Sequence, residues 1–314
     1  MEEILEPELL ICDPHHHLWD RPGDRYMTEE LMADLESGHR IERTVFIECR
    51  SGYRTDGPEA FRPVGETEFV LAADPGDTIA GIIGHADLRL PEVDDVLKAQ
   101  IEAGQGRFRG IRQINAWDAS PDVQRAGSTI PAHLLGDADF KRGFPGLGRN
   151  GLSFEAWLYH PQIPELTEVA RAFPEVPILL DHLGGMVGVG PYRDHQADVH
   201  ATWRASLSEL ATCPNVTIKL GGIGMPMFGM DWHEHPDSTT SADIANRWGD
   251  DIRWCIEEFG VERAMFESNF PVDKVSCSYA VLWNAFKIIA ADASSSEKAA
   301  LFHDTAVRFY RLDD

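Results

Sequence analysis

The sequence predicts one (β/α)8 barrel that spans residues 1–314. Eight short apolar runs alternate along the chain with segments of helical spacing, and this alternation predicts parallel βαβ units. Eight such units close a barrel, and a single barrel of this length is common. An open doubly wound sheet is the alternative, but no Gly-x-Gly-x-x-Gly follows the first apolar run. We therefore expect the residues that follow the runs to meet at one face of a barrel.

The expected strands are short and apolar, and most of them end at polar residues. They span residues 9–15, 44–49, 79–85, 108–114, 152–159, 177–181, 216–220 and 264–267. Helices are expected between them, opening at Thr28 and Pro91 and spanning 161–173, 198–213, 241–259, 276–291 and 295–310. Long connections at 184–197 and 221–240 follow the sixth and seventh strands. The second contains Met225, Phe228 and Trp232, which predict a wall of a pocket because such apolar side chains avoid water.

The composition limits the class of partner. The chain has 52 acidic and 28 basic residues and a formal net charge of −24, which disfavours nucleic acid and anionic lipid. It has no long uncharged apolar run and no signal-peptide pattern at its beginning. Its five cysteines lack Cys-x-x-Cys spacing, which indicates reduced thiols. We expect a cytoplasmic protein, compatible with a homo-oligomer, that binds a small anionic molecule through local arginines.

The first expected strand runs into a histidine cluster, Asp13-Pro14-His15-His16-His17-Leu18-Trp19. Side chains two residues apart in a strand share a face, so His15 and His17 are expected together and His16 on the opposite face. A pair of imidazoles at the mouth of a strand is a starting set of ligands for a Zn²⁺-type cation. A surface cluster of histidines is the alternative.

The other strands also end in residues that can do chemistry. These residues are Glu48, Arg50 and Arg54 near the second strand, His85 at the third, Arg112 and Trp117 near the fourth, Tyr159 and His160 at the fifth, Asp181 and His182 at the sixth, Lys219 in the seventh, and Glu267, Asn269 and Asp273 at the eighth. A lone histidine is more often structural. Histidines at the ends of the first, third, fifth and sixth strands are expected to converge on one barrel mouth.

Four motifs carry a resemblance to a known family. They are Asp-x-His-x-His-Leu-Trp at the first strand, Arg-Gly-Ile-Arg at 109–112, Asp-His-Leu-Gly at 181–184 and Ser-Asn-Phe-Pro at 268–271. Together they resemble the amidohydrolase-2 family, and within it the branch of fuconolactonase-like, pyrone-dicarboxylate and sulfomuconolactone hydrolases. The resemblance covers essentially the whole chain. It implies a hydrolase that opens a cyclic ester or amide, often with one divalent ion.

The resemblance also implies a set of metal ligands. His15 and His17 match the first-strand ligands and His182 matches the sixth-strand histidine, while His160 stands where related families place a fifth-strand ligand. Three or four imidazoles suit Zn²⁺, with Mn²⁺ as the second choice. Some lactonases of this branch are believed to work without a metal, so the resemblance leaves open that the ion is absent.

The chain departs from the family at the eighth strand. The family pattern is Gly-Ser-Asp-Trp-Pro, whose aspartate acts as general base, whereas this chain has Glu267-Ser268-Asn269-Phe270-Pro271. An asparagine can orient a water molecule but cannot take its proton. Either Asp273, Glu267 or His182 supplies the base, or the reaction needs none there, or hydrolysis is lost.

The expected mechanism is metal-assisted hydrolysis, in which the ion activates a water molecule and polarises a carbonyl group. Arg50, Arg54 and Arg112 are expected to clamp a substrate carboxylate, with structural ion pairs as the alternative. Lys219 is expected to contact substrate or to pair with Glu48 inside the barrel. Trp117 and Tyr159 are expected as pocket walls.

Two other functions remain open at this point. Related barrels use the same histidines in metal-dependent decarboxylases, and a barrel can also bind a small ligand without turning it over. Nucleophilic serine catalysis is disfavoured because the chain has no Gly-x-Ser-x-Gly context around Ser153 or Ser268.

Overall fold

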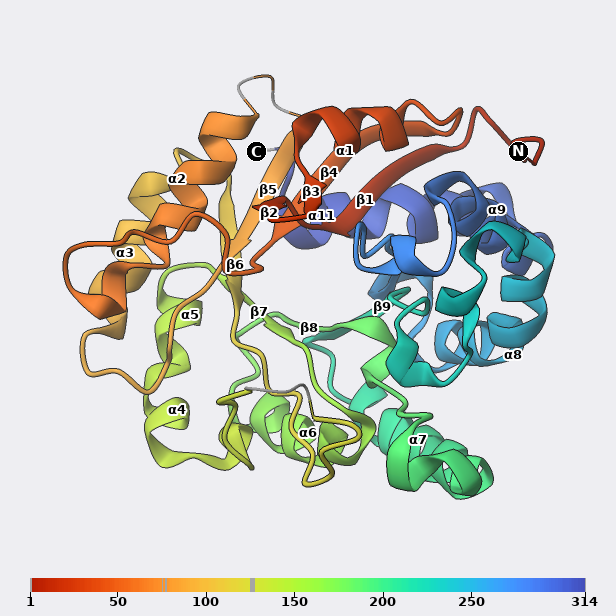
Figure 1. The fold of residues 1–314 in the computed structure, drawn as a ribbon. Helices are drawn as coiled ribbons and strands as arrows, with labels where there is room; N and C mark the ends of the chain where they lie inside the picture. Colours follow the sequence, from red (N-terminus) through yellow and green to blue (C-terminus); the bar gives the residue numbers. More distant parts are fainter. Residues whose placement is uncertain (1, 75, 77, 125–127, 314) are drawn as a thin grey trace.

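Eight parallel strands form one sheet that curls into a barrel (Figure 1), in the order β1-β4-β5-β6-β7-β8-β9-β10. The computed structural model describes residues 2–74, 76, 78–124 and 128–313. The strands are β1 Leu10–His16, β4 Arg40–Ile47, β5 Ile79–Gly84, β6 Phe108–Arg112, β7 Ser153–Ala156, β8 Ile178–Leu180, β9 Val216–Leu220 and β10 Ala264–Phe266. All eight lie within or overlap the expected runs, so the predicted fold class is confirmed.

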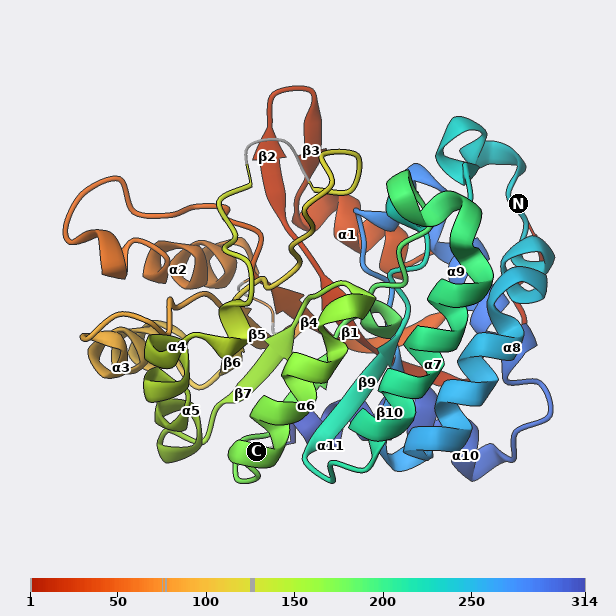
Figure 2. The same cartoon turned by 90° about the horizontal axis from the view of Figure 1, so that it is seen from below.

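Helices form the outer layer around the strands (Figures 1 and 2). They are α1 Thr28–Leu35, α2 Val64–Ala73, α3 Val93–Ala103, α4 Ala138–Gly143, α5 Pro145–Arg149, α6 Ile163–Ala172, α7 Gln196–Ala211, α8 Ser241–Phe259, α9 Tyr279–Ile289, α10 Ser295–Ala299 and α11 Thr305–Tyr310. Their apolar faces and the outer faces of the strands form the main core. Within the described ranges, no helix is long and apolar enough to cross a membrane.

Three features differ from the sequence-based expectation. The helix expected over 295–310 is divided into α10, a π-helical turn at Ala300–Asp304, and α11. A two-stranded hairpin, β2 Trp19–Arg21 with β3 Asp24–Tyr26, stands directly after the histidine cluster. The connection between β6 and α4 is longer than the two loops singled out from the sequence. The hairpin and this connection both reach the catalytic face.

The barrel closes between the ends of β1 and β10. The amide of His17 donates to Phe270 O at 2.8 Å, and the amide of Asn269 donates to His15 O at 2.9 Å. These bonds place the residues after β10 beside the histidine cluster after β1, although 254 positions separate His15 from Asn269.

The barrel interior has an apolar part and an ionic part. Val45, Ile83, Met265 and Tyr310 belong to a small cluster of buried apolar side chains separate from the main core. The hydroxyl of Tyr310, on α11, donates to Glu155 Oε1 at 2.5 Å and so joins that cluster to the ionic groups nearer the catalytic face.

Candidate active site

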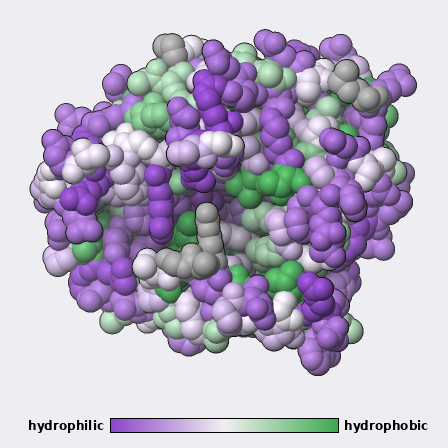
Figure 3. All heavy atoms as spheres, in the orientation of Figure 1, coloured by the Kyte–Doolittle hydropathy of each residue, from purple (hydrophilic) through white to green (hydrophobic). Residues whose placement is uncertain are grey.

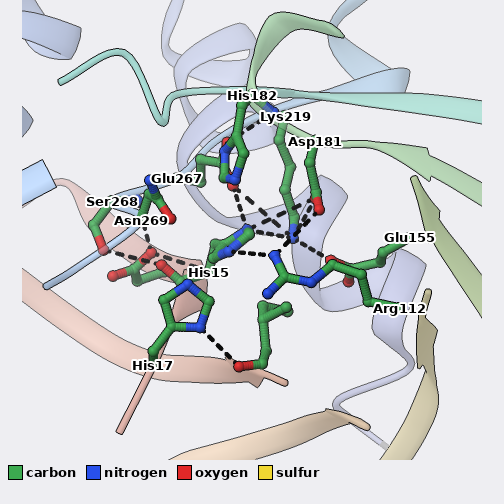
Figure 4. A network of polar contacts seen from close by, with 12 residues as sticks. His15, His17, Arg112, Glu155, Asp181, His182, Lys219, Glu267, Ser268 and Asn269 are labelled. Atoms are coloured by element: carbon green, nitrogen blue, oxygen red, sulfur yellow. Dashed lines mark hydrogen bonds and ion pairs between the residues drawn. The ribbon is translucent and has the colours of Figure 1, made fainter. Parts of the chain in front are cut away.

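Three histidines are held with the same ring nitrogen facing an oxygen acceptor (Figure 4). His17 Nδ1 lies 2.8 Å from Ile47 O. One carboxylate serves the other two, because Glu267 Oε2 is 2.7 Å from His15 Nδ1 and Glu267 Oε1 is 2.7 Å from His182 Nδ1. With a proton on each Nδ1, each Nε2 keeps a free lone pair. Proteins commonly orient metal-binding imidazoles through such a hydrogen bond at the other ring nitrogen.

The three imidazole rings lie close together and are buried. Ring centroids are 5.0 Å apart between His15 and His17 and 4.6 Å apart between His15 and His182. Burial lowers the pKa of His15 and of His17 well below the ordinary value, and the charge of Lys219 lowers that of His15 further. Both rings are therefore neutral at pH 7, which is the form that binds metal.

A network of buried charges lies around these rings. Lys219 Nζ contacts Glu155 Oε2 at 2.8 Å, Asp181 Oδ1 at 3.3 Å and His15 Nδ1 at 3.1 Å. Burial by itself would lower the pKa of Lys219, but the charges of Asp181, Glu155 and Glu267 outweigh it and raise that pKa. Lys219 is therefore a charged partner of Glu155 and Asp181, whereas the sequence-based pairing was with Glu48.

Glu48 pairs with Arg112. The Nε of Arg112 donates to Glu48 Oε1 at 3.1 Å, and its Nη1 lies 3.6 Å from Asp181 Oδ2. Burial by itself would lower the pKa of Arg112, but Glu48 and Asp181 raise it. Both buried cations thus approach Asp181, which joins the ionic network to the histidines.

The donor atoms suit a divalent cation. His15, Asp181 and His182 each offer a ligand atom, and these atoms lie within 4.8 Å of one another. Both side-chain oxygens of Asp181 are buried, and in the described part of the chain they have ion-pair contacts with Lys219 and Arg112. Arg112 Nη1 lies 3.3 Å from His15 Nε2, so an ion bound to that nitrogen would displace this contact. Imidazole nitrogens with a carboxylate are ligands of Zn²⁺ and Mn²⁺.

Asn269 is held by Asp273. Its Nδ2 donates to Asp273 Oδ1 at 2.8 Å, and the amide of Gly224 donates to Asp273 Oδ2 at 2.8 Å. Asn269 has φ = 55°, a left-handed conformation that asparagine tolerates better than most residues. Burial raises the pKa of Asp273 to about 7. Within the described residues, Oδ1 of Asn269 has no hydrogen-bond partner, so it can accept a bond from a ligand in the cavity that Asn269 lines.

Two glycines after β9 make room for the histidine and its carboxylate. A Cβ on Gly222 would lie 2.1 Å from His182 Nδ1, and a Cβ on Gly221 would lie 2.4 Å from Glu267 Cγ. Gly222 also has φ = 65°. The Gly-Gly pair after Leu220 was therefore a signal for the site that the sequence analysis did not use.

A cavity of about 580 Å³ opens above the histidines, and the molecular surface is hollowed near the centre of this face (Figure 3). Three arginines line it, Arg21, Arg50 and Arg112, whereas Glu48 is the one acidic residue among its described lining residues. This local excess of cations contrasts with the net charge of −24 of the chain. The cavity therefore suits an anionic molecule.

The structure brings some of the predicted residues together at this cavity. Those that line it are His17, Arg50, Arg112, Tyr159, His182 and Asn269. His15 and Lys219 are fully buried in the ionic network, and Asp273 is fully buried against Asn269. The expected loop residue Met225 also lines the cavity.

Three predicted residues have other surroundings. His160 Nδ1 accepts a hydrogen bond from the amide of Val187 at 3.3 Å, and its ring packs edge-on against Tyr192. Arg54 Nε donates to Glu68 Oε2 at 3.1 Å on the surface. Trp117 packs near His133, with ring centroids 6.2 Å apart. None of the three is among the described residues that line the cavity, so we do not retain them in the proposed site.

Other lining residues were not anticipated. Trp19 and Arg21 come from the β2–β3 hairpin, and the Arg21 guanidinium lies 4.2 Å from the Trp19 ring centroid. Gln124, Ser128 and Ile130 come from the long connection after β6. The Pro22-Gly23 pair is a turn signal that could have predicted the hairpin, but the connection has no comparable pattern.

Two curated relatives match nearly the full length of the chain. The Sinorhizobium fredii protein y4mH is 34% identical over 340 residues, which cover 97% of this chain and 99% of that protein. The L-fucono-1,5-lactonase of Burkholderia multivorans is 30% identical over 326 residues and 97% of either chain.

Solved structures match over the same length. An amidohydrolase from Burkholderia multivorans with bound HEPES has a TM-score of 0.76 and 25% identity and covers 96% of this chain and 99% of that chain. A second crystal form, with bound zinc, has the same TM-score and 24% identity, with the same coverage. A manganese complex of 5-carboxyvanillate decarboxylase from Novosphingobium aromaticivorans has a TM-score of 0.60 and 14% identity, and covers 98% of this chain and 97% of that one.

The family assignment rests on the match of the whole barrel. The family model described as amidohydrolase matches residues 12–312, from the histidine strand to the last helix. With the histidine-centred site at the mouth of a (β/α)8 barrel and two long relatives at 30% identity or more, this match agrees with the motifs of the sequence. The chain therefore belongs to the amidohydrolase family of enzymes.

Proposed function

We propose that this protein hydrolyses a lactone or related cyclic ester of a small molecule that carries a carboxylate, with the help of one divalent ion. The observation that carries the proposal is the set of imidazoles held through Nδ1 beneath a cavity lined by three arginines. The 30% identity to an L-fucono-1,5-lactonase supports lactone chemistry. The zinc-bound neighbour supports zinc as the first choice of ion, with manganese second.

His15, His17, His182 and Asp181 would hold the ion. When bound, the ion would polarise the ester carbonyl and lower the pKa of a water molecule. Glu267 fixes the tautomer of two of the imidazoles, since each of its oxygens faces an Nδ1. Glu267 is therefore a positioning residue for His15 and His182.

Asn269 and Asp273 replace the family aspartate in this proposal. The free Oδ1 of Asn269 accepts a hydrogen bond from the attacking water and orients it, while Asp273 holds the amide in place. Asp273 is our candidate for the proton acceptor, because it contacts the amide of Asn269 and its pKa of about 7 suits a general base at neutral pH.

A screen of lactones, with and without a charged substituent, tests the proposed function. The protein is assayed with added Zn²⁺ or Mn²⁺ and with a chelator, and ring opening is followed by release of acid. We expect turnover of a carboxylate-bearing lactone that the chelator abolishes. No turnover of any lactone in any of these conditions would contradict the proposal.

Decarboxylation is the second candidate. The manganese complex of 5-carboxyvanillate decarboxylase shares the fold over 98% of this chain, and the amide at residue 269 does not discriminate between the two reactions. The same screen therefore includes aromatic acids, with CO₂ release as the measurement. CO₂ release without any lactone hydrolysis would favour the decarboxylase.

A further inference from the structure

We propose that Arg50 is the cation of a second, acid-binding subsite, so that the substrate carries an acidic group remote from the bond that reacts. This inference rests on the proposed function and specifies its substrate class. A smaller cavity of about 180 Å³, here called the side pocket, shares Glu48, Arg50, Ile114 and Ile130 with the main cavity. Arg50 therefore stands where the two cavities meet.

Arg50 differs from the other arginines that line the two cavities. Arg21 donates to Cys49 O, Arg89 is ion-paired with Asp87, and Arg112 with Glu48. Arg50 makes no hydrogen bond or ion pair within the described ranges. In a chain with 52 acidic and 28 basic residues, carboxylate partners are abundant. An unpaired guanidinium at the junction of two cavities is thus available to a ligand, and its planar fork suits a carboxylate.

The backbone at Arg50 is strained and fixed. Arg50 has φ = 65°, a conformation that L-residues other than asparagine and aspartate rarely adopt. Glu66 Oε1 accepts hydrogen bonds from the amides on both sides of it, Cys49 at 2.9 Å and Ser51 at 2.7 Å. Strain of this kind persists where the surroundings enforce it, and it is concentrated at functional sites. Glu66 is therefore a positioning residue for Arg50.

Helix α2 presses closely on the same loop. A Cβ on Gly65 would lie 2.6 Å from Gly52 O and 2.6 Å from the Arg54 amide nitrogen, and a Cβ on Gly52 would lie 2.6 Å from Phe69 Cβ. Both glycines are needed for this approach. The backbone of the loop that carries Arg50 is thus held along its length, while the Arg50 side chain is exposed and available to a ligand.

The side pocket has a second unsatisfied polar group. His85 lines it, and His85 Nδ1 lies 3.1 Å from Arg112 O. No partner of His85 Nε2 occurs in the part of the chain that the structure describes. Arg89 and Gln113 also line the pocket, but both bind Asp87. Because His85 Nδ1 faces a carbonyl oxygen and carries the proton, Nε2 is an acceptor, and Arg50 is the donor that remains for a carboxylate of the ligand.

The test measures binding, so it does not depend on turnover. Calorimetric titration of the protein compares each dicarboxylate, succinate, glutarate and adipate, with the monocarboxylate of the same length, butyrate, valerate and hexanoate. We expect at least one dicarboxylate to bind about tenfold or more tightly than its partner, because a second charge-assisted bond forms at Arg50. Equal affinities in all three pairs would overturn the proposal.

The variant Arg50→Asn decides whether Arg50 is responsible. Asparagine tolerates the left-handed backbone, so we expect an unchanged or higher Tm together with a dicarboxylate preference reduced to about one. A dicarboxylate that binds only through a metal ion would keep its preference in this variant, and that result would contradict the inference. Arg54→Gln, in the same loop but bound to Glu68, is the matched control and should keep the wild-type preference.

Two variants of Glu66 test the positioning role. Burial and the charge of Glu48 raise the pKa of Glu66 to about 8, so the protonated group resembles an amide at neutral pH. Glu66→Gln keeps an acceptor oxygen and should keep the dicarboxylate preference, whereas Glu66→Ala should lose it while monocarboxylate affinity stays. Loss in both variants, or in neither, would refute the role of Glu66. If Glu66→Ala does not fold, Glu66→Gln and Arg50→Asn still decide the two claims.

Discussion

At the scale of single residues, the largest departure from the family is at the end of β10. The resemblance places an aspartate where this chain has Asn269, and glycine where it has Glu267. The structure connects the two changes with the histidines, since Glu267 faces the Nδ1 of both His15 and His182. The carboxylate of Glu267 thus lies behind the imidazoles, and the side chain that faces the cavity at this strand end is the amide of Asn269.

The role of Asp273 can be tested with Asp273→Asn. Asp273 must be deprotonated to accept a proton, so the proposed activity should increase as the pH rises through about 7. We expect the variant to lose this rise of activity with pH and to have a kcat about 100-fold lower than that of the wild type. Zinc content, measured by atomic emission, should not change because Asp273 is not a proposed ligand. A pH profile that keeps its limb near 7 would assign the base elsewhere.

At the scale of elements, the residues that follow β9 leave the space that the His182 side chain occupies in the site. The sequence predicted this strand at residues 216–220, and the structure confirms those bounds. The sequence did not show that Gly221 and Gly222 are needed. That need depends on Glu267 and His182, which follow β10 and β8 and pack against these two glycines. Gly222 meets a histidine that is 40 residues away in the sequence.

Gly222→Ala and Gly57→Ala form a matched pair. Both glycines have positive φ, 65° and 76°, so alanine costs about 1 kcal/mol of backbone strain at either position. Only the Gly222 Cβ would collide with His182, whereas nothing lies within 4 Å of a Cβ on Gly57. We expect Gly222→Ala to weaken zinc binding, measured by chelator competition, by about tenfold or more. Equal zinc affinity in the two variants would show that the glycine is not needed for the site.

At the scale of the whole molecule, the last helix closes the barrel interior. Tyr310 on α11 is fully buried, and its hydroxyl donates to Glu155, which also binds Lys219. The charge network under the histidines therefore depends on a residue near the end of the chain. The family match to residue 312 includes this helix.

Tyr310→Phe tests this dependence. Removal of the hydroxyl leaves Glu155 Oε1 without that buried donor, so we expect a loss of about 1–3 kcal/mol in the free energy of unfolding. Tyr159→Phe is the comparison, because its hydroxyl makes only a 3.5 Å contact with Val123 O and its loss should change stability by less than about 0.5 kcal/mol. Urea denaturation measures both. Equal losses would mean that the Glu155 contact adds no stability.

The sequence alone predicted the barrel from its local periodicity, and four motifs carried the resemblance to the family. It also predicted a site at the strand ends, from residues close together in the chain such as His15 and His17, which a strand places on one face by geometry alone. The tertiary structure decided which charges are partnered. Lys219 binds Glu155 and Asp181, Arg54 is bound to Glu68, and Arg50 has no partner among the residues that the structure describes. Such pairings depend on distances between side chains on different elements, which the order of residues does not encode locally, and they determine which groups remain to meet a ligand.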